Sequence, residues 1–342
     1  MKRREFITAL GALGFAPRIC FSQQAPNFGA HFADMHSHLL RRQGVSREAL
    51  ARQRMLVVAE KVIPDGPLIR LMGNRLGVHR DAQPGEMRKS FEAQFQRLRG
   101  QIERERVPTI SSISSFEQGL RDRTPAIALS SEGADFLEGD LGYLDKVRAE
   151  GLVVLQLVHY RISDVGDIST EEPKHNGLTA FGRDVVRAAN RLGMLIDVAH
   201  CTSAGIEQVL EISTKPVIYS HGHVTEAAPA ARLGGIRARA IHAPLAKRVA
   251  ETGGVVGIWP LGAMFRDREA YVDALVRTAE TVGVRHVGIG SDINGLTSTV
   301  LPTHDEFAEV ADLLGKRGLK APETAGIMGD NFIRALGQAL TT

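Results

Sequence analysis

Short apolar runs rich in β-branched residues alternate with longer amphipathic stretches along most of this 342-residue sequence. The runs that predict strands are residues 32–35, 126–130, 153–158, 194–198, 217–219, 255–259 and 286–290. Helical patterns occupy residues 91–106, 141–150, 181–191, 203–213, 243–252, 270–282 and 304–317. This alternation predicts parallel βα units. It leaves two architectures open, a TIM-like (β/α)8 barrel and a doubly wound sheet.

Residues 39–86 have a weaker pattern. We expect a further strand near residues 55–62 and an insertion that covers the substrate. The charge-rich stretch at residues 97–106 is interpreted as the solvated face of a helix rather than a binding patch.

Histidines and acids cluster where the predicted strands end. They are His36, His38, Glu132, His159, His200, His221 and Asp292. His36 and His38 are two residues apart, so both side chains point to the same side of an extended strand. In a parallel barrel all carboxyl ends open on one face, where active sites are built from several strand ends. Imidazoles with carboxylates suit zinc or a related divalent ion, so the pattern predicts a hydrolytic metal site.

The positive charge of the chain is concentrated at its beginning. Four basic residues, Lys2, Arg3, Arg4 and Arg18, against Glu5 supply 4 − 1 = +3, which equals the formal net charge of the whole sequence. The remainder is therefore near neutrality, and nucleic-acid binding loses its main support.

The same segment has the design of a signal peptide. Paired arginines are followed by Phe6 and a modest apolar run that ends at Ala16. We expect a Tat-type leader over residues 1–25, a transient contact with the Tat export machinery, and a periplasmic or secreted protein. The run is about half of the ~20 residues that span a bilayer, so no stable membrane span is expected after cleavage.

The sequence has two cysteines, Cys20 and Cys201. Because Cys20 lies in the leader, no disulfide is expected within the mature chain. Cys201 follows His200 and is either a soft ligand or reactive thiol or, as we favour, a buried packing residue.

Several stretches together resemble a known family. They are Gly177-Leu-Thr-Ala-Phe-Gly-Arg-Asp-Val-Val-Arg-Ala-Ala-Asn-Arg-Leu-Gly-Met-Leu-Ile-Asp-Val-Ala-His, Ser131-Glu-Gly-Ala-Asp, Lys215-Pro-Val-Ile-Tyr-Ser-His, Gly253-Gly-Val-Val-Gly and His286-Val-Gly-Ile-Gly-Ser-Asp. In their order along the chain they resemble the membrane (renal) dipeptidase family, peptidase family M19, among the amidohydrolase-like metal-dependent hydrolases. The resemblance implies a single TIM-like barrel domain over residues 26–342, a small peptide substrate and a homodimer.

The resemblance also implies roles for the residues at the strand ends. His36 and His38 would hold one zinc ion, His200 and His221 a second, and Glu132 would bridge the two. A water shared by two dications is deprotonated easily and can attack an amide carbonyl. Asp292 would relay the proton, His159 would bind the substrate and stabilise the oxyanion, and Arg232 would bind the substrate carboxylate.

The chain departs from the family pattern at two positions. His38 stands where the family usually has aspartate, so one metal position loses about a unit of compensating charge. His-x-His is nevertheless the common first motif of the wider amidohydrolase superfamily, so we expect a working site. Asn294 stands where aspartate is frequent. His223 competes with His221 as a ligand, and we favour His221 because it directly follows its strand.

Three functional hypotheses remain. The first is an exported zinc dipeptidase that cleaves dipeptides, including those with a D-residue. The second is an altered barrel that binds a ligand or metal without turnover, and the third is a non-peptidase amidohydrolase. The sequence has neither a Gly-x-x-x-x-Gly-Lys-Ser/Thr loop nor a Gly-x-Ser-x-Gly elbow, which disfavours nucleotide binding and a serine hydrolase.

Overall fold

Eight parallel strands form the central sheet of the computed structural model, which describes residues 31–41, 46–73, 75–227 and 235–341. The expected leader and Arg232 lie outside these ranges. The strands, in spatial order, are β1 (Phe32–Ser37), β2 (Met55–Val62), β5 (Ala126–Glu132), β6 (Leu152–Gln156), β7 (Leu195–Asp197), β8 (Val217–Tyr219), β11 (Val255–Ile258) and β12 (Val287–Ile289). All eight are buried along their whole length, which is typical of parallel sheets covered on both faces.

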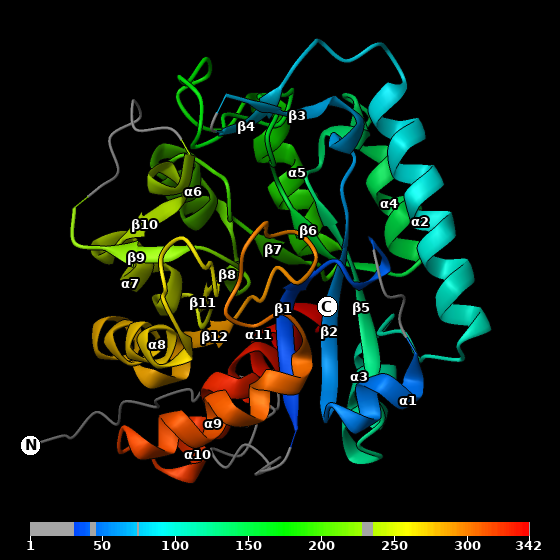
Figure 1. Ribbon diagram of the computed structural model, residues 1–342. Helices are drawn as coiled ribbons and strands as arrows, with labels where there is room; N and C mark the ends of the chain where they lie inside the picture. Colours follow the sequence, from blue (N-terminus) through cyan, green and yellow to red (C-terminus); the bar gives the residue numbers. More distant parts are fainter. Residues whose placement is uncertain (1–30, 42–45, 74, 228–234, 342) are drawn as a thin grey trace, which may run out of the picture.

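The two edges of this sheet meet. Ser37 bridges Ile293 in parallel, and the Asp292 amide donates a hydrogen bond to the carbonyl of His36 at 2.9 Å. The sheet therefore nearly closes into a barrel surrounded by helices (Figure 1). The expected TIM-like barrel is confirmed, and the doubly wound alternative is wrong.

The helices cover the outside of the barrel. They are α1 (Arg47–Arg52), α2 (Glu86–Arg104), α3 (Ile113–Arg121), α4 (Gly142–Ala149), α5 (Ala180–Arg191), α6 (Ser203–Ile212), α7 (Ala243–Glu251), α8 (Arg268–Val282), α9 (Phe307–Lys316), α10 (Ala321–Ala325) and α11 (Asn331–Leu340). The helix expected at residues 304–317 begins with a separate 3-10 turn, η7 (His304–Glu306), capped by Thr303. None of the described helices is long and apolar enough to cross a bilayer.

Helix α11 was not predicted and closes the amino-terminal end of the barrel. Its buried Phe332 and Leu336 belong to the same apolar cluster as Ala33, Leu195 and Val255, which lie at or near the starts of their strands. The opposite, carboxyl-terminal end is thereby left as the open face, as in other barrels of this type.

Two small sheets lie outside the barrel. The hairpin of β3 (Ile69–Met72) and β4 (Arg75–Val78) belongs to the weakly patterned segment, where an insertion was expected. The parallel pair of β9 (His223–Thr225) and β10 (Ala240–His242) follows β8.

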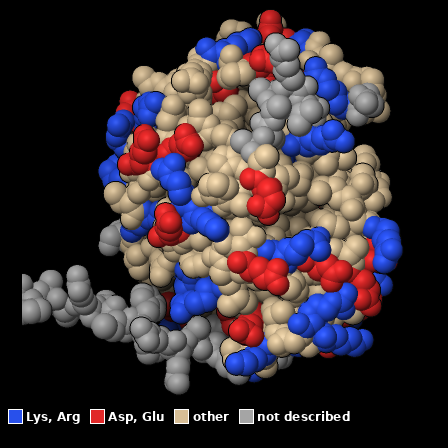
Figure 2. Space-filling view, turned by 90° about the vertical axis from the view of Figure 1, so that its left-hand side faces the viewer, with Lys and Arg blue, Asp and Glu red and all other residues tan. Residues whose placement is uncertain are grey.

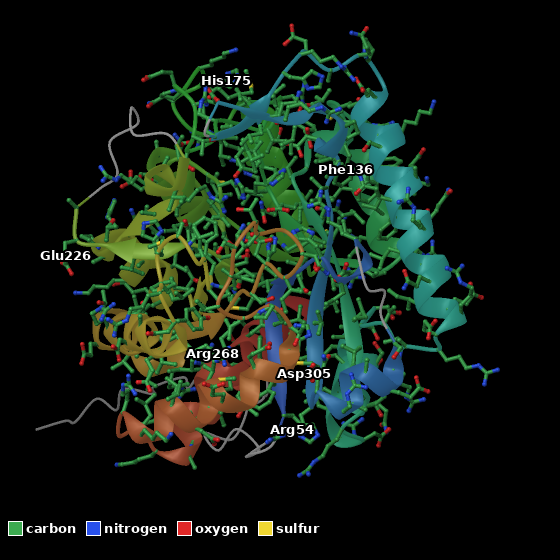
Figure 3. All side chains as sticks on the ribbon, viewed as in Figure 1. Arg54, Phe136, His175, Glu226, Arg268 and Asp305 are labelled. Atoms are coloured by element: carbon green, nitrogen blue, oxygen red, sulfur yellow. The ribbon has the colours of Figure 1, made fainter. Side chains whose placement is uncertain are left out.

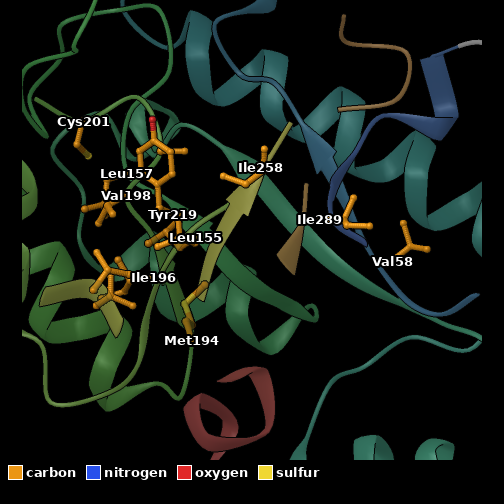
Figure 4. Packing of buried hydrophobic residues seen from close by; sticks show 14 of the residues in the cluster. Val58, Leu155, Leu157, Met194, Ile196, Val198, Cys201, Tyr219, Ile258 and Ile289 are labelled. Atoms are coloured by element: carbon orange, nitrogen blue, oxygen red, sulfur yellow. The ribbon is translucent and has the colours of Figure 1, made fainter. Parts of the chain in front are cut away.

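Cys201 is a packing residue. It belongs to the buried cluster that contains Leu157 and Val198 (Figure 4), and burial raises the pKa of its thiol. A thiol whose pKa is raised is a poor nucleophile and a poor ligand.

Charged residues of both signs share one face of the molecule. On the face shown in Figure 2, lysine and arginine are interspersed with aspartate and glutamate, without a continuous basic patch.

Two glycines allow the end of β8 to lie deep in the barrel. A Cβ at Gly257 or at Gly290 would lie 1.9 Å from the backbone oxygen of Ser220, the residue before His221. Any side chain there would therefore push the strand end away from its neighbours.

We predict that Gly290→Ala lowers the free energy of unfolding by roughly 1–3 kcal/mol or more, because overpacking displaces backbone. The measurement is chemical denaturation of the purified protein. Gly315→Ala in α9, where a Cβ meets nothing within 4 Å, is the control and should be neutral or stabilising. Equal stability of both variants would contradict the packing argument.

Candidate metal centre

The seven polar residues predicted at strand ends meet at the carboxyl-terminal end of the barrel. Glu132, which ends β5, lies at their centre. Its Oε1 is 3.4 Å from His36 Nε2, 3.3 Å from His159 Nε2, 3.2 Å from His200 Nε2 and 3.5 Å from His221 Nε2. Its Oε2 is 3.2 Å from His38 Nε2, which is also 3.3 Å from Asp292 Oδ1. All seven side chains are buried.

The donor atoms fit divalent metal ions. The Nε2 atoms of His36 and His38 are 3.1 Å apart, and those of His200 and His221 are 3.3 Å apart. Two nitrogens at ~2.0–2.1 Å from a tetrahedral ion are separated by about 3.4 Å. Three overlapping groups have ligand atoms within 4.8 Å of one another: His36 with Glu132 and His221, His36 with His38 and Asp292, and Glu132 with His159 and His200.

The electrostatics prepare three of the rings to act as ligands. Burial lowers the pKa of His36, and it holds the pKa of His200 and His221 well below the usual range. These rings are neutral at neutral pH, which leaves a nitrogen lone pair for a metal. Burial opposes ionisation of Glu132, but the neighbouring rings, His159 above all, outweigh it and hold the pKa of the carboxyl well below its ordinary value.

The other two rings behave differently. Burial lowers the pKa of His38, but hydrogen bonds with Asp292 and Glu132 outweigh it and raise the pKa to about 10. For His159, burial is likewise outweighed by the Asp65 and Glu132 carboxylates, and its pKa is raised.

Asp65 fixes the orientation of His159 and was missed by the sequence analysis. Its Oδ1 is 2.7 Å from His159 Nδ1, and its Oδ2 accepts the Tyr160 amide at 3.0 Å. The Nε2 of His159 is therefore directed towards Glu132. Asp65 lies three residues beyond β2, so the strand-end pattern would have revealed it had that strand been assigned firmly.

Asp34 joins β1 to the segment after β12. Its Oδ1 accepts the amides of His36 and Ser291 at 3.1 and 3.0 Å, and its Oδ2 lies 2.8 Å from His304 Nε2. His304 is buried at this contact. His175, by contrast, is exposed at the edge of the molecule (Figure 3).

Unusual backbone conformation coincides with the site. His200, Asp292 and Asn294 have φ values of 68°, 49° and 65°, a region that few residues other than glycine adopt. Asparagine tolerates this region well, and the Asn294 side chain donates to the carbonyl of His38 at 3.2 Å. Asn294 thus supports the first motif instead of acting as a ligand.

Ser220 touches one histidine of each pair. Its Oγ is 2.8 Å from His221 Nδ1 and 3.2 Å from His36 Nδ1. A hydroxyl oxygen can accept from both Nδ1–H groups, which puts the lone pair of each ring on Nε2, the nitrogen that faces the cluster. The Ser220 amide donates to Asp197 at 3.0 Å, and the Asp197 carboxylate forms a buried 2.9 Å ion pair with Lys61.

We predict that Ser220→Ala lowers the affinity for zinc by roughly 10- to 100-fold, as loss of a residue that orients metal ligands usually does. The measurement is a zinc titration against a competing chelator.

Ser131→Ala is the matched control. Ser131 is equally buried and precedes Glu132, but its hydroxyl has no hydrogen-bond partner in the described part of the chain. Equal zinc affinity of both variants would show that Ser220 does not orient the ligands.

The cluster opens into a cavity of about 880 Å³. Arg239, buried in its wall, places Nη2 2.7 Å from His221 Nε2 and its guanidinium 4.9 Å from the centre of the Trp259 ring. The sequence analysis missed Arg239, because no local pattern separates it from neighbouring Arg237. His223 stacks on the Trp259 ring instead, 6.4 Å away, and belongs to none of the three ligand groups.

Residues 76–342 match the model of the membrane dipeptidase family, peptidase family M19. The chain belongs to this family. The resemblance seen in the sequence motifs is thereby confirmed. The match to the M19 family begins within β4, so β1 with His36 and His38 lies before it.

Relatives of the M19 family can be compared individually. The chain is 27% identical to dipeptidase aclJ of Aspergillus oryzae over 219 residues, which cover 61% of this chain and 50% of that protein. It spans about half the length of the curated relatives it matches first.

Solved structures share the fold. Dipeptidase AC, a metallopeptidase of family M19, superposes with a TM-score of 0.77 at 18% identity, covering 92% of this chain and 100% of that one. A metallopeptidase from Rhodobacter sphaeroides, solved with a phosphinate mimic of the dipeptide L-Ala-D-Ala, gives 0.72 at 18% identity, covering 90% and 99%.

Proposed function

We propose that this chain is a zinc-dependent dipeptidase that holds two zinc ions at the Glu132 cluster. The observation that carries the proposal is the position of the Glu132 carboxylate between two histidine pairs, 3.2–3.5 Å from each Nε2. His36 and His38 would hold one ion, His200 and His221 the other, and Glu132 both. His38 would give up its proton when the ion binds. When bound, two such ions supply an activated water at neutral pH and polarise the peptide carbonyl.

The remaining residues of the cluster would handle protons and charge. Asp292 is buried beside His38 and would accept a proton during attack and return it to the departing amine. His159 is held by Asp65 with Nε2 directed into the site, where it would donate a hydrogen bond to the carbonyl oxygen as negative charge develops.

Arg239 would bind the terminal carboxylate of the dipeptide. The guanidinium lies against the histidine cluster in the cavity wall, and its planar fork suits bidentate binding of a carboxylate. We therefore propose that Arg239 binds the carboxylate; Arg232, for which the sequence analysis predicts this role, lies outside the described residues.

The proposal includes export. The paired arginines Arg3 and Arg4 and the apolar run that follows them support a twin-arginine leader and a periplasmic location.

We predict about two zinc ions per chain and hydrolysis of small L,L or L,D dipeptides that stops when a chelator removes the metal. The measurements are elemental analysis of the purified protein and a dipeptide panel. Glu132→Gln should keep the fold by circular dichroism but lose most metal and turnover. One zinc ion or none, with no turnover after zinc is restored, would favour a barrel that binds without catalysis.

For Arg239→Ala we expect kcat/KM for a free dipeptide to fall roughly 30-fold or more, since loss of a buried charge partner costs ~2 kcal/mol or more. For the C-terminal amide of the same dipeptide kcat/KM should change little, so the variant should hydrolyse the free acid and the amide with similar kcat/KM. Arg187→Ala, which removes a surface guanidinium paired with Asp184, is the control. An equal loss for acid and amide would assign Arg239 a role other than carboxylate binding.

A further inference from the structure

Large exposed hydrophobic side chains are concentrated near one opening. Among the described residues they are Leu71, Met72, Leu76, Ile236 and Met264. Leu71, Leu76 and Ile236 line the cavity that contains Glu132, and Met264 follows Ala263, which also lines it. Single exposed hydrophobic residues are ordinary, but a group of them beside a cavity is typical of a binding surface.

One face of the β3–β4 hairpin is apolar, and the hairpin lines the cavity with side chains of that face together with Arg70 and Arg75. Leu71 pairs with Leu76 across the two strands, and Ile69 pairs with Val78. Alternation places these four side chains on one face, and Ile69, Leu71 and Leu76 all line the cavity. Figure 1 shows the hairpin apart from the barrel strands.

The described part of the chain covers Ile69 and Val78 only partly and leaves Leu71 and Leu76 exposed. Leu71 is 72% exposed and Leu76 is 38% exposed, and Ile236 in the 3-10 helix η5 (Gly235–Arg239) is 39% exposed. Leaving three large apolar side chains in water gains nothing for folding, because only their removal from water is favourable. The face therefore fits a ligand that enters the same cavity.

The size of the cavity agrees with such a ligand. Its volume of about 880 Å³ lies near the upper end of the ~300–1,000 Å³ that hold drug-sized ligands. A dipeptide of two small residues would leave much of it unfilled.

Resting on the proposed function, we infer that the preferred substrate is a dipeptide bearing a bulky apolar side chain or substituent, which binds the apolar rim formed by Leu71, Leu76 and Ile236. Its carboxylate would lie at Arg239, which is only 3% exposed, while the apolar group would extend to the exposed rim. The rim would then select substrates by size and hydrophobicity.

The test compares kcat and KM for X-Ala dipeptides in which X is alanine, leucine, phenylalanine or naphthylalanine. We expect kcat/KM to rise at least 10-fold from the smallest to the largest, mainly through KM, since added apolar groups are worth such factors in a pocket. In the double variant Leu71→Ser/Leu76→Ser the preference should disappear while turnover of Ala-Ala stays within about two-fold.

Met72→Ser is the matched control. Met72 pairs with Arg75 on the same hairpin and is 44% exposed, but it does not line the cavity. Turnover without a preference for bulky groups, or an equal effect of Met72→Ser, would overturn the inference. A third result would also overturn it. If light scattering shows that the double variant is a monomer where the unsubstituted protein is a dimer, and the preference for bulky dipeptides is unchanged, the rim is a subunit interface.

Failure of the proposed function is recognised separately. The same four dipeptides are titrated calorimetrically into folded Glu132→Gln protein with either the native or the doubly substituted rim. Bulky dipeptides could bind more tightly to the native rim while the unsubstituted enzyme hydrolyses none of the four. That result would support the role of the rim in binding and refute the proposed dipeptidase activity. Equal affinity for all four dipeptides would refute selection by the rim, whether or not the enzyme hydrolyses them.

Discussion

The structure depends on one buried carboxylate. Glu132 is almost completely removed from water, and an isolated ionised carboxyl in such a place would be very costly. It is tolerated because ring nitrogens from β1 and from the segments after β1, β6, β7 and β8 surround it within 3.5 Å. Bringing five imidazoles to one carboxylate requires strand ends from around a barrel, so fold and site impose each other.

Three aspartates form a second layer beneath the rings. Asp34 holds the backbone of His36, Asp65 holds the ring of His159, and Asp197 accepts the amides of Ala199 and Ser220, next to His200 and His221. Asp65 sets the tautomer and direction of the His159 ring, whereas Asp34 and Asp197 fix the backbone that carries the other rings. The burial of Asp197 is made tolerable by Lys61, whose ammonium group reaches it from another strand.

The region around the cavity mouth differs from the barrel in burial. Barrel strands are buried on all sides, whereas the β3–β4 hairpin has exposed apolar side chains and belongs to none of the strands that hold the cluster. Changes in the hairpin can therefore alter what enters the cavity without moving Glu132. In barrels of this kind the catalytic residues usually lie on the strand ends, and the surrounding loops determine which substrates bind.

The sequence by itself determined the barrel strands, the seven residues at their ends and the family, because hydrophobic runs and terminal histidines are local patterns. It placed His36, His38, Glu132, His159, His200, His221 and Asp292 correctly at strand ends, and all seven meet in space. It did not reveal Asp65, Arg239, the bridging contacts of Ser220, or α11 beneath the barrel. Those depend on which side chains meet across strands distant in sequence, and only closure of the barrel brings the partners together.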